Sequence, residues 1–350
     1  MVPVVNVYRG GFLESIHEGS VSVVDEEGRL VASAGNPSFR TFIRSAAKPL
    51  QAIPMLEAGG SDAYELSARE LALICASHGG ENHHVSTAAA LLRKGDFDES
   101  DLVCGPHLPY DEKSAVELKQ SGENPTALHN NCSGNHAGLL LCSELMDEPP
   151  EEYAEMGSAL QSRVLRTVAE FASLQPEEIE RGVDGCGIPA FRMPLARAAL
   201  AYARLALESR DESRPYHREC KQIFDAMTGA PEYVAGNWSM TTPLIRALGG
   251  HVLAKEGAEG FYAMALDEEA SARVREHHRL RDGRFLGIAI KIADGSSERS
   301  RNPVVLRTLE ILGIPPEPSA ELDPFLDPAV HNVAGKVVGE VKAEFDLTFL

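Results

Sequence analysis

The chain has 350 residues, 43% of them hydrophobic and 24% charged, which is the composition of a globular protein long enough to bury a sizeable core. Its 52 Asp and Glu outnumber 33 Lys and Arg, and the net charge of -19 argues against nucleic acid and anionic membranes as partners. Residues 1–6 lack the basic and apolar segments of a signal peptide, and no apolar run approaches the ~20 residues that cross a bilayer. We therefore expect a cytoplasmic protein whose six cysteines are core, metal-binding or reactive thiols rather than disulfides.

The first 35 residues predict strands. Val and Ile are frequent in residues 4–8, 12–24 and 29–34, and the acidic, glycine-containing segment 25–28 is typical of a hairpin turn between the last two runs.

The middle of the chain predicts helices. Residues 67–70 have the spacing of a capping box, and apolar residues recur at helical intervals through 151–173. Two more helices are expected at 194–208 and 216–228.

Strand character returns near the C-terminus, at residues 251–254, 261–265, 285–292 and 337–345, with a helix at 304–312.

This order indicates an α/β (α+β) protein with two lobes. Both chain ends, residues 1–44 and 230–350, would form a discontinuous α/β lobe, and residues 45–229 a mainly helical lobe. Clefts between lobes commonly hold active sites.

Ser45 and Lys48 are the first candidate pair for chemistry. If a helix begins near Ser45, positions i and i+3 face the same way, and Lys48 could take the seryl proton. It can do so only as a free amine, which requires burial or neighbouring cations to destabilise its charge. Taken alone the motif is weak, because a helix cap followed by a solvated lysine has the same sequence.

Residues 75–84 form the second candidate, with Ser77 and a histidine beside two glycines that would let the backbone approach a ligand. A helix C-cap followed by a polar loop is the alternative.

The third candidate is residues 129–138, where small, polar and nucleophilic side chains precede an apolar helix whose free N–H groups could bind a developing oxyanion. A plain capped helix would need only one such polar residue.

Cys132, Cys186 and Asp184 could together form a tetrahedral metal site with thiolate and carboxylate ligands. Two cysteines so far apart in the sequence are more often buried free thiols. Lys255, at the end of a predicted strand and before a glycine, could lie across a cleft from a serine, although most lysines in such turns are solvated.

Taken together, six motifs in order resemble the asparaginase II family, whose best-known members are the rhizobial-type asparaginases. The resemblance extends from the N-terminal strands to the last strand. The motifs are residues 45–49, 76–79, 104–107, 129–134, 184–187 and 255–260.

The resemblance implies a fold like that of serine β-lactamases and serine-dependent glutaminases, with an antiparallel sheet flanked by helices, a helical lobe and a homodimer. It implies hydrolysis of L-asparagine to L-aspartate and ammonia. Two Ser–Lys pairs are implied, Ser45 with Lys48 and Ser77 with Lys255. We expect Ser45 to be the nucleophile and Lys48 its base, while Ser77 and a cationic Lys255 relay protons or protonate the ammonia.

The resemblance also implies a zinc ion near the substrate and no organic cofactor. Its ligands would be Cys132, Cys186 and Asp184, but the family's lysine ligand is replaced here by Asn135, a poorer zinc ligand. Asp184, water or His136 would then complete the shell. Arg44, His136 and Asp184 are the expected substrate-binding residues, with a structural ion pair as the alternative role of Arg44.

Three other functions fit the same sequence. A glutaminase or a β-lactam-binding protein on the same scaffold is the nearest, since one methylene group is worth only ~1–3 kcal/mol of discrimination in a pocket. A non-catalytic protein held together by a thiol–zinc site is the second, and a catalytically inactive binder is the third.

Overall fold

The computed structural model describes residues 1–350, which form two compact units. We call them the sheet unit and the helical unit. The sheet unit comprises Met1–Ala46, Met193–Arg210 and Pro243–Leu350, and the helical unit Ala47–Arg192 and Asp211–Thr242.

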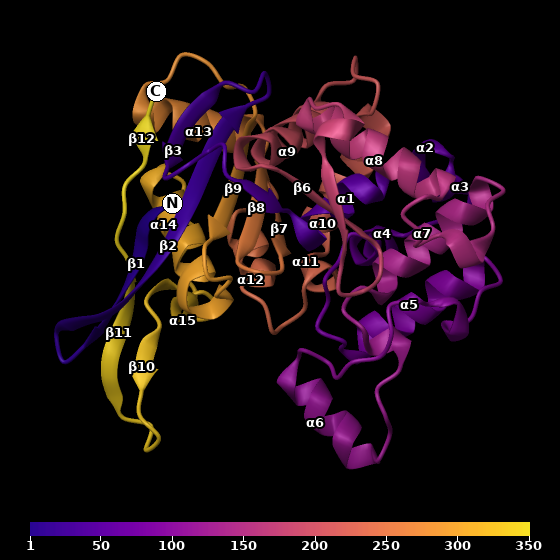
Figure 1. Cartoon of the computed structure of the whole chain (residues 1–350), viewed down its shortest axis with the longest axis horizontal. Coiled ribbons are helices and arrows are strands. Elements are labelled where there is room, and N and C mark those ends of the chain that lie inside the picture. The colour runs from indigo at the N-terminus through magenta and orange to yellow at the C-terminus, as the bar shows by residue number, and fades with distance from the viewer. The chain divides into compact units, whose positions relative to one another are not determined.

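The sheet unit is built around a nine-stranded antiparallel sheet (Figure 1). The main path runs β10-β11-β1-β2-β9-β8-β7, and β3 pairs with both β2 and β12. The strands are β1 (Val2–Arg9), β2 (Phe12–Asp25), β3 (Leu30–Ala34), β7 (Val252–Gly257), β8 (Phe261–Leu266), β9 (Leu286–Ile292), β10 (Ala329–His331), β11 (Val337–Ala343) and β12 (Thr348–Phe349).

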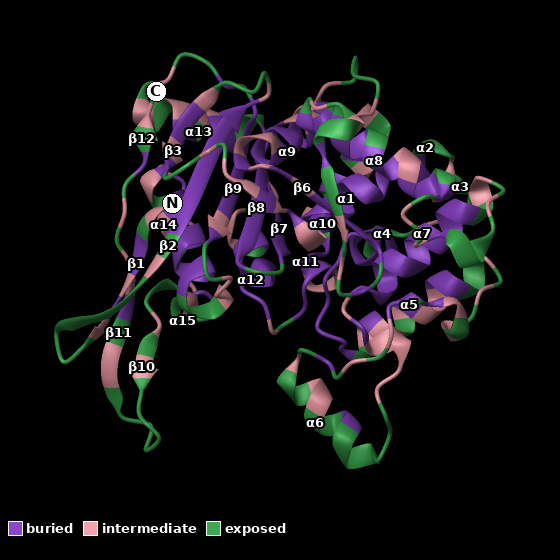
Figure 2. Ribbon diagram, viewed as in Figure 1, coloured by how far each residue is buried: buried purple, intermediate pink, exposed green.

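The hairpin predicted at residues 25–28 is present. Asp25 N–H donates to Arg29 O at 3.1 Å, and Gly28 adopts a φ of 84°, which a residue with a Cβ rarely does. The tips of β2 and β10 are exposed, whereas β7, β8 and β9 are buried along almost their whole length (Figure 2).

Helix α9 (Leu195–Arg210) covers the buried strands β8 and β9. Its alanines allow close packing. At Gly287 of β9 there is no room for a side chain, because a Cβ at this position would overlap the Ala199 carbonyl oxygen. This helix falls within residues 45–229, which were expected to form the mainly helical lobe, but it packs with the sheet. Helices α13 (Glu268–His278) and α14 (Asn302–Ile311) complete the packing on β8 and on β1 and β11.

The helical unit is centred on α7, which lies against α4 and α5. Gly134 of α7 makes this approach possible, since a Cβ there would lie 2.5 Å from Leu73 O. The helices of this unit are α1 (Lys48–Gln51), α2 (Ile53–Glu57), α3 (Gly60–Ala63), α4 (Ala68–Ile74), α5 (Asn82–Lys94), α6 (Glu112–Ser121), α7 (Ser133–Leu145), α8 (Ala159–Ala172), α10 (His217–Gly229) and α11 (Pro231–Val234).

A hairpin of β5 (Glu180–Val183) and β6 (Pro189–Pro194) pairs antiparallel from Glu180 to Val183, and its residues as far as Arg192 belong to the helical unit. The predicted capping box at Ser67 is present, with Glu70 N–H donating to Ser67 Oγ and Ser67 N–H to Glu70 Oε2.

One helix is shorter than the sequence predicts. The apolar pattern of 151–173 suggested a single helix, but α8 begins only at Ala159, because Ser158 caps it by accepting a hydrogen bond from Gln161 N–H. The preceding segment is a short 3₁₀ turn, Pro150–Glu152.

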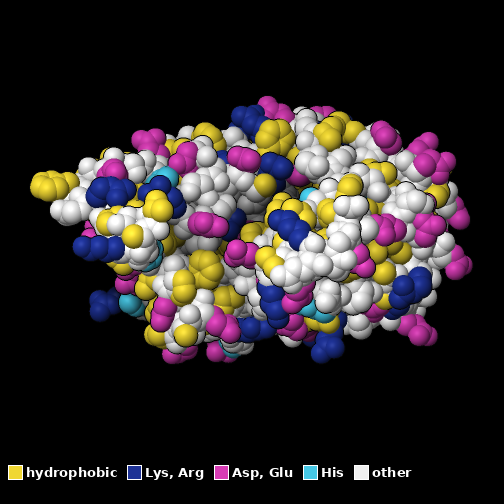
Figure 3. Space-filling model, turned by 90° about the horizontal axis from the view of Figure 1, so that it is seen from below, with side chains coloured by type: hydrophobic (Ala, Val, Ile, Leu, Met, Phe, Trp, Pro, Cys, Tyr) yellow, Lys and Arg dark blue, Asp and Glu magenta, His cyan; other side chains and the backbone are white.

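None of the helices is both long enough and apolar enough to span a bilayer. On the face shown in Figure 3, acidic side chains are distributed among the Lys and Arg side chains rather than collected in one patch.

Candidate active site

Lys48 is a titratable residue of the helical unit that contacts both a serine and a cysteine. It begins α1, is 1% exposed, and its Nζ donates hydrogen bonds to Ala76 O, to Ser77 Oγ at 3.2 Å and to Cys132 Sγ at 3.1 Å. A buried lysine that contacts a serine hydroxyl has the geometry required of a general base.

The segment that carries Ser77 is held by backbone hydrogen bonds on both sides. Helix α4 ends at Ile74, and the chain then continues without regular structure: Ser77 N–H donates to Val234 O at 2.9 Å, and His78 N–H donates to Asn131 O at 3.0 Å. The Ser77 hydroxyl is therefore fixed by its neighbours rather than carried on a mobile loop.

Cys132 and Cys186 form a buried pair beside Lys48. The pKa of the Cys132 thiol is lowered because Cys186 donates a hydrogen bond to its sulfur and because Lys48 lies next to it, although burial acts in the opposite direction. The same pairing, together with burial, raises the pKa of Cys186. One thiolate stabilised by one thiol and one lysine is consistent with either a metal-ligand pair or a local acid–base pair.

Asn135 and His136 lie on the first turn of α7, next to Cys132. Asn135 Oδ1 and His136 Nε2 are both buried and have no hydrogen-bond partner. The other nitrogen of His136 lies 2.6 Å from the Tyr153 hydroxyl, and burial, followed by the charge of Lys48, lowers the pKa of His136 to about 3. These two buried polar atoms on one turn are therefore able to contact a ligand.

Asp184 occupies the β5–β6 turn together with Cys186. Its N–H donates to Ile188 O at 2.8 Å, and its carboxylate accepts a hydrogen bond from Gly185 N–H at 2.6 Å. The negative charge of Asp184 acts on both Cys132 and His136, so the predicted residues Lys48, Ser77, Cys132, Cys186, His136 and Asp184 form one neighbourhood of the helical unit.

Arg44, Ser45 and Lys255 belong to the sheet unit. Arg44 has a φ of 50°, a left-handed conformation that is strained for a residue with a side chain, and such strain often marks functional sites. Ser45 is half-buried in the 3₁₀ turn Arg44–Ala47, which the Tyr202 hydroxyl anchors by donating to Ala46 O at 2.8 Å.

Lys255 lies near the end of β7, is fully buried, and donates to Glu256 O at 2.9 Å. The strand lies against the chain just before Ser45, because a Cβ on Gly257 would be 2.6 Å from Ile43 O. A buried ion pair between Arg301 and Glu256, 2.9 Å long, supports this end of the strand.

Two residues of the motifs 104–107 and 129–134 hold the backbone near the site, a role that the sequence did not predict. Asn130 Nδ2 donates to Cys104 O and Gly105 O, and His107 Nε2 accepts a hydrogen bond from Asn131 N–H at 2.9 Å. The motif at residues 104–107 thus holds the entry to α7, and only the crowding of polar residues in both motifs could have suggested this.

A cavity of about 520 Å³ lies elsewhere in the sheet unit, between α14, the turn α15 (Asp323–Leu326) and β11. Its lining includes Leu306, Leu322 and Lys342 but none of the candidate catalytic residues, so it is not where we place the chemistry.

The L-asparaginase II family matches this chain over residues 5–343. The chain belongs to that family. No curated protein matches it in sequence. Assignment to the family therefore rests on nearly the whole length of the chain.

Solved structures show only distant likeness. The native form of Mglu is 12% identical with a TM-score of 0.44, covering 86% of this chain and 66% of that chain. The glutamate form of Mglu is 13% identical with a TM-score of 0.42, covering 85% and 61%. A Bacillus glutaminase crystallised in 4.3 M NaCl is 13% identical with a TM-score of 0.36, covering 78% and 83%. The chain spans less than two thirds of the Mglu chains that it matches.

Proposed function

We propose that this protein hydrolyses the side-chain amide of L-asparagine to L-aspartate and ammonia, using a serine activated by Lys48. Membership of the L-asparaginase II family supports the substrate class. The observation that carries the mechanism is the buried Lys48 Nζ, 3.2 Å from Ser77 Oγ and three residues after Ser45.

In the structure Lys48 Nζ donates three hydrogen bonds, to Ala76 O, Ser77 Oγ and Cys132 Sγ. As the proposed base it would keep its contacts to Ala76 O and to the Cys132 sulfur and would accept the hydroxyl proton of a serine through its lone pair. Ala76 O and the Cys132 sulfur keep their hydrogen bonds after the amine has taken the proton, so proton transfer leaves neither acceptor unpaired.

In the proposed reaction, Ser45 Oγ attacks the amide carbon while its proton passes to Lys48. The tetrahedral oxyanion then collapses, the C–N bond breaks, and Lys255 donates a proton to the departing ammonia. Water hydrolyses the resulting ester, releasing aspartate and restoring the serine. Ser77 relays protons between the two lysines.

Ser77 is a second candidate for the nucleophile. It is Ser77, and not Ser45, whose hydroxyl has a hydrogen bond to Lys48 within the helical unit. In this version Ser77 would be acylated and Ser45 would relay protons.

Substrate binding is proposed for three residues around the amide. Arg44 would pair with the α-carboxylate, Asp184 with the α-ammonium group, and the unpartnered His136 Nε2 would hydrogen-bond the substrate. Glutamine is the alternative substrate on the same residues. We further propose that the protein works in the cytoplasm as a homodimer, as the family resemblance implies.

Cys132 and Cys186 fit a zinc ion in part. Their buried, hydrogen-bonded thiols supply two soft ligands, and the unpaired Asn135 Oδ1 would be a third in place of a lysine. Asp184 is nearby but its carboxylate is already bonded to Gly185 N–H. A zinc ion held there would act as a Lewis acid toward the substrate.

The test is ammonia release from asparagine and glutamine by the native chain and by the Ser45→Ala and Ser77→Ala variants. The acyl-enzyme trapped with a slow amide or ester substrate would be mapped by peptide mass. An ester on Ser45 supports the first version and an ester on Ser77 the second. Near-normal turnover in both variants, or no ammonia from either amide, would refute the proposal.

A further inference from the structure

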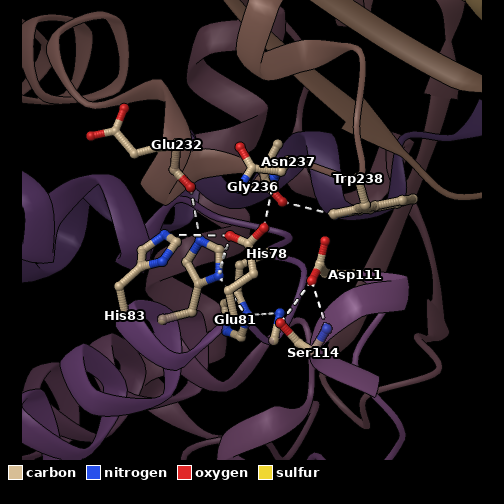
Figure 4. Close-up of polar contacts among 12 residues, drawn as sticks. His78, Glu81, His83, Asp111, Ser114, Glu232, Gly236, Asn237 and Trp238 are labelled. Carbon is tan, nitrogen blue, oxygen red and sulfur yellow. Dashed lines mark hydrogen bonds and ion pairs between the residues drawn. The ribbon is translucent and has the colours of Figure 1, made fainter. Parts of the chain in front are cut away.

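Three potential metal-binding side chains meet at the start of α5, away from the cysteine pair. Glu81 precedes the helix, and His83 and His84 lie in its first turn. Figure 4 shows the Glu81 carboxylate and the His83 ring pointing toward each other. Glu81 Oε2 is 3.5 Å from His83 Nε2 and 3.5 Å from His84 Nδ1, and all three ligand atoms lie within 4.8 Å of one another.

The Glu81 carboxylate is only half satisfied. Its Oε1 accepts a hydrogen bond from Asn237 N–H at 3.0 Å, but Oε2 has no hydrogen-bond partner although the residue is 6% exposed. His83 Nε2 is also buried and unpartnered. A buried carboxylate oxygen without a donor is costly, so this arrangement points to a cation between the two side chains.

His84 is oriented as a metal ligand. Its Nε2 donates to Glu232 O at 2.8 Å, and its Nδ1 accepts a long hydrogen bond of 3.2 Å from Glu81 N–H. The proton is therefore on Nε2, and a metal bound at Nδ1 would replace the hydrogen bond that this atom accepts from Glu81 N–H. A carbonyl that fixes the far nitrogen of an imidazole is the usual outer support of a ligating histidine.

Gly236 keeps space open beside these atoms. A Cβ on Gly236 would lie 3.0 Å from Glu81 Oε2 and 2.9 Å from His84 Cε1, and its φ of 89° also requires glycine. The loop that provides Asn237 therefore closes over the cluster without filling it (Figure 4).

We propose that Glu81, His83 and His84 bind a divalent transition metal, with zinc as the best fit, at a site separate from Cys132 and Cys186. Ligand atoms on a tetrahedral zinc with bonds of about 2.1 Å lie about 3.4 Å apart, close to the two 3.5 Å separations from Glu81 Oε2. Two imidazoles and one carboxylate favour zinc over magnesium or calcium, which prefer oxygen ligands.

The His83 side chain is 34% exposed, which gives the ion a route to solvent and leaves room for a water as the fourth ligand. The surplus negative charge of the chain also attracts cations to its surface.

A metal at this site would fix the loop that carries Ser77. Glu81 is four residues after Ser77, and the His78 ring stacks on His84 with centroids 4.8 Å apart. The ion would also tie α5 to the backbone at Asn237 through the Glu81 carboxylate. Its expected effect is rigidity of this loop rather than a part in the bond-breaking step.

The experiment uses the full chain with Cys132→Ser and Cys186→Ser, so that thiolate sites are removed. Cobalt and zinc would be titrated into this protein and into variants of it that also carry His83→Ala or Glu81→Gln. A variant with His217→Ala on α10 would be the matched control. We expect one equivalent of metal, visible cobalt bands without thiolate charge-transfer absorption, and at least about tenfold weaker binding in the His83 and Glu81 variants.

Unchanged binding in the His83→Ala variant, or no binding of either metal to the chain that lacks Cys132 and Cys186, would overturn the proposal. His83 is partly exposed, so its variant should fold even if Glu81→Gln does not, and circular dichroism would verify this. Equal losses in the His217→Ala control would show non-specific surface binding and would also overturn it.

Discussion

Lys48 combines near-complete burial with three acceptors for its amine. The hydrogen bond from Cys186 and the charge of Lys48 lower the pKa of the Cys132 thiol. In the proposed mechanism the same amine would take a proton from a serine.

Replacing Lys48 by Met keeps the length of the side chain and removes the amine. We expect ammonia release from asparagine to fall by at least about a thousandfold, because the serine loses its base. Raising the pH should not rescue the variant, since the methionine side chain has no group that deprotonation could turn into a base. Steady-state ammonia assays from neutral to alkaline pH would measure this.

Lys119→Met on the exposed face of α6 is the matched control and should retain full activity. Substantial turnover by the Lys48→Met variant at any pH would exclude Lys48 as the base.

Buried histidines predict acid sensitivity. Burial lowers the pKa of His136 to about 3, whereas an unfolded chain would have the ordinary value near 6.5. Between these values the unfolded state binds the extra proton, so the free energy of unfolding falls as the pH falls below about 6.5. His84 has the same shift, to about 3, and burial also lowers the pKa of His78.

His136→Gln should therefore flatten the pH dependence of stability by up to about 1.4 kcal/mol per pH unit between about pH 6 and pH 4. Urea unfolding at several pH values would measure the slope, with the exposed His331→Gln as control. An equal slope in the native chain and the His136 variant would contradict the prediction.

The sequence indicated which residues to examine but not all their partners. Ser77, Lys48 and Cys132 lie in motifs rich in polar residues, and the structure brings them into contact, although their catalytic roles remain predictions. Glu81 Oε1 accepts its hydrogen bond from the backbone N–H of Asn237, more than 150 residues away in the chain, while Oε2 has no partner, and no local pattern could reveal this.

At the scale of helices and strands, periodicity located most elements. The strands at residues 12–24 and 285–292 and the helix at 194–208 are found within a few residues of the prediction. The failure at 151–158 has a local cause, because the N-cap at Ser158 outweighs the apolar pattern. The position of α9 on the sheet could not be predicted, since packing partners are not encoded in the period of one helix.

The contact between α9 and β9 should be highly sensitive to volume. Gly287→Ala would force the strand and the Ala199 backbone apart, and we expect a loss of about 3 kcal/mol in the free energy of unfolding. Denaturant unfolding would measure the loss.

Gly229→Ala at the end of α10 is the control, because a Cβ there has no neighbour within 4 Å. It should raise stability by up to about 1 kcal/mol, since alanine is a better helix former than glycine. A Gly287→Ala variant as stable as the native chain would mean that α9 does not pack as described.

At the scale of the whole molecule, the net charge of -19 should make stability depend on salt. Like charges repel in the compact state, and raising NaCl from about 0.01 M to about 0.1 M shortens the Debye length from about 30 to about 10 Å. We expect the thermal midpoint to rise by a few degrees, because this repulsion outweighs the weakening of surface ion pairs.

Differential scanning calorimetry at neutral pH would measure the change. Near pH 5.1, where the net charge approaches zero, the salt dependence should vanish. A midpoint that falls with salt at neutral pH would show that surface ion pairs dominate instead.

All six cysteines are buried. A new cysteine at Val333, a fully exposed position in the turn between β10 and β11, would therefore react with a maleimide dye well before any native thiol. This allows a fluorophore or a solid support to be attached at a single chosen place with every natural sulfur left in the chain.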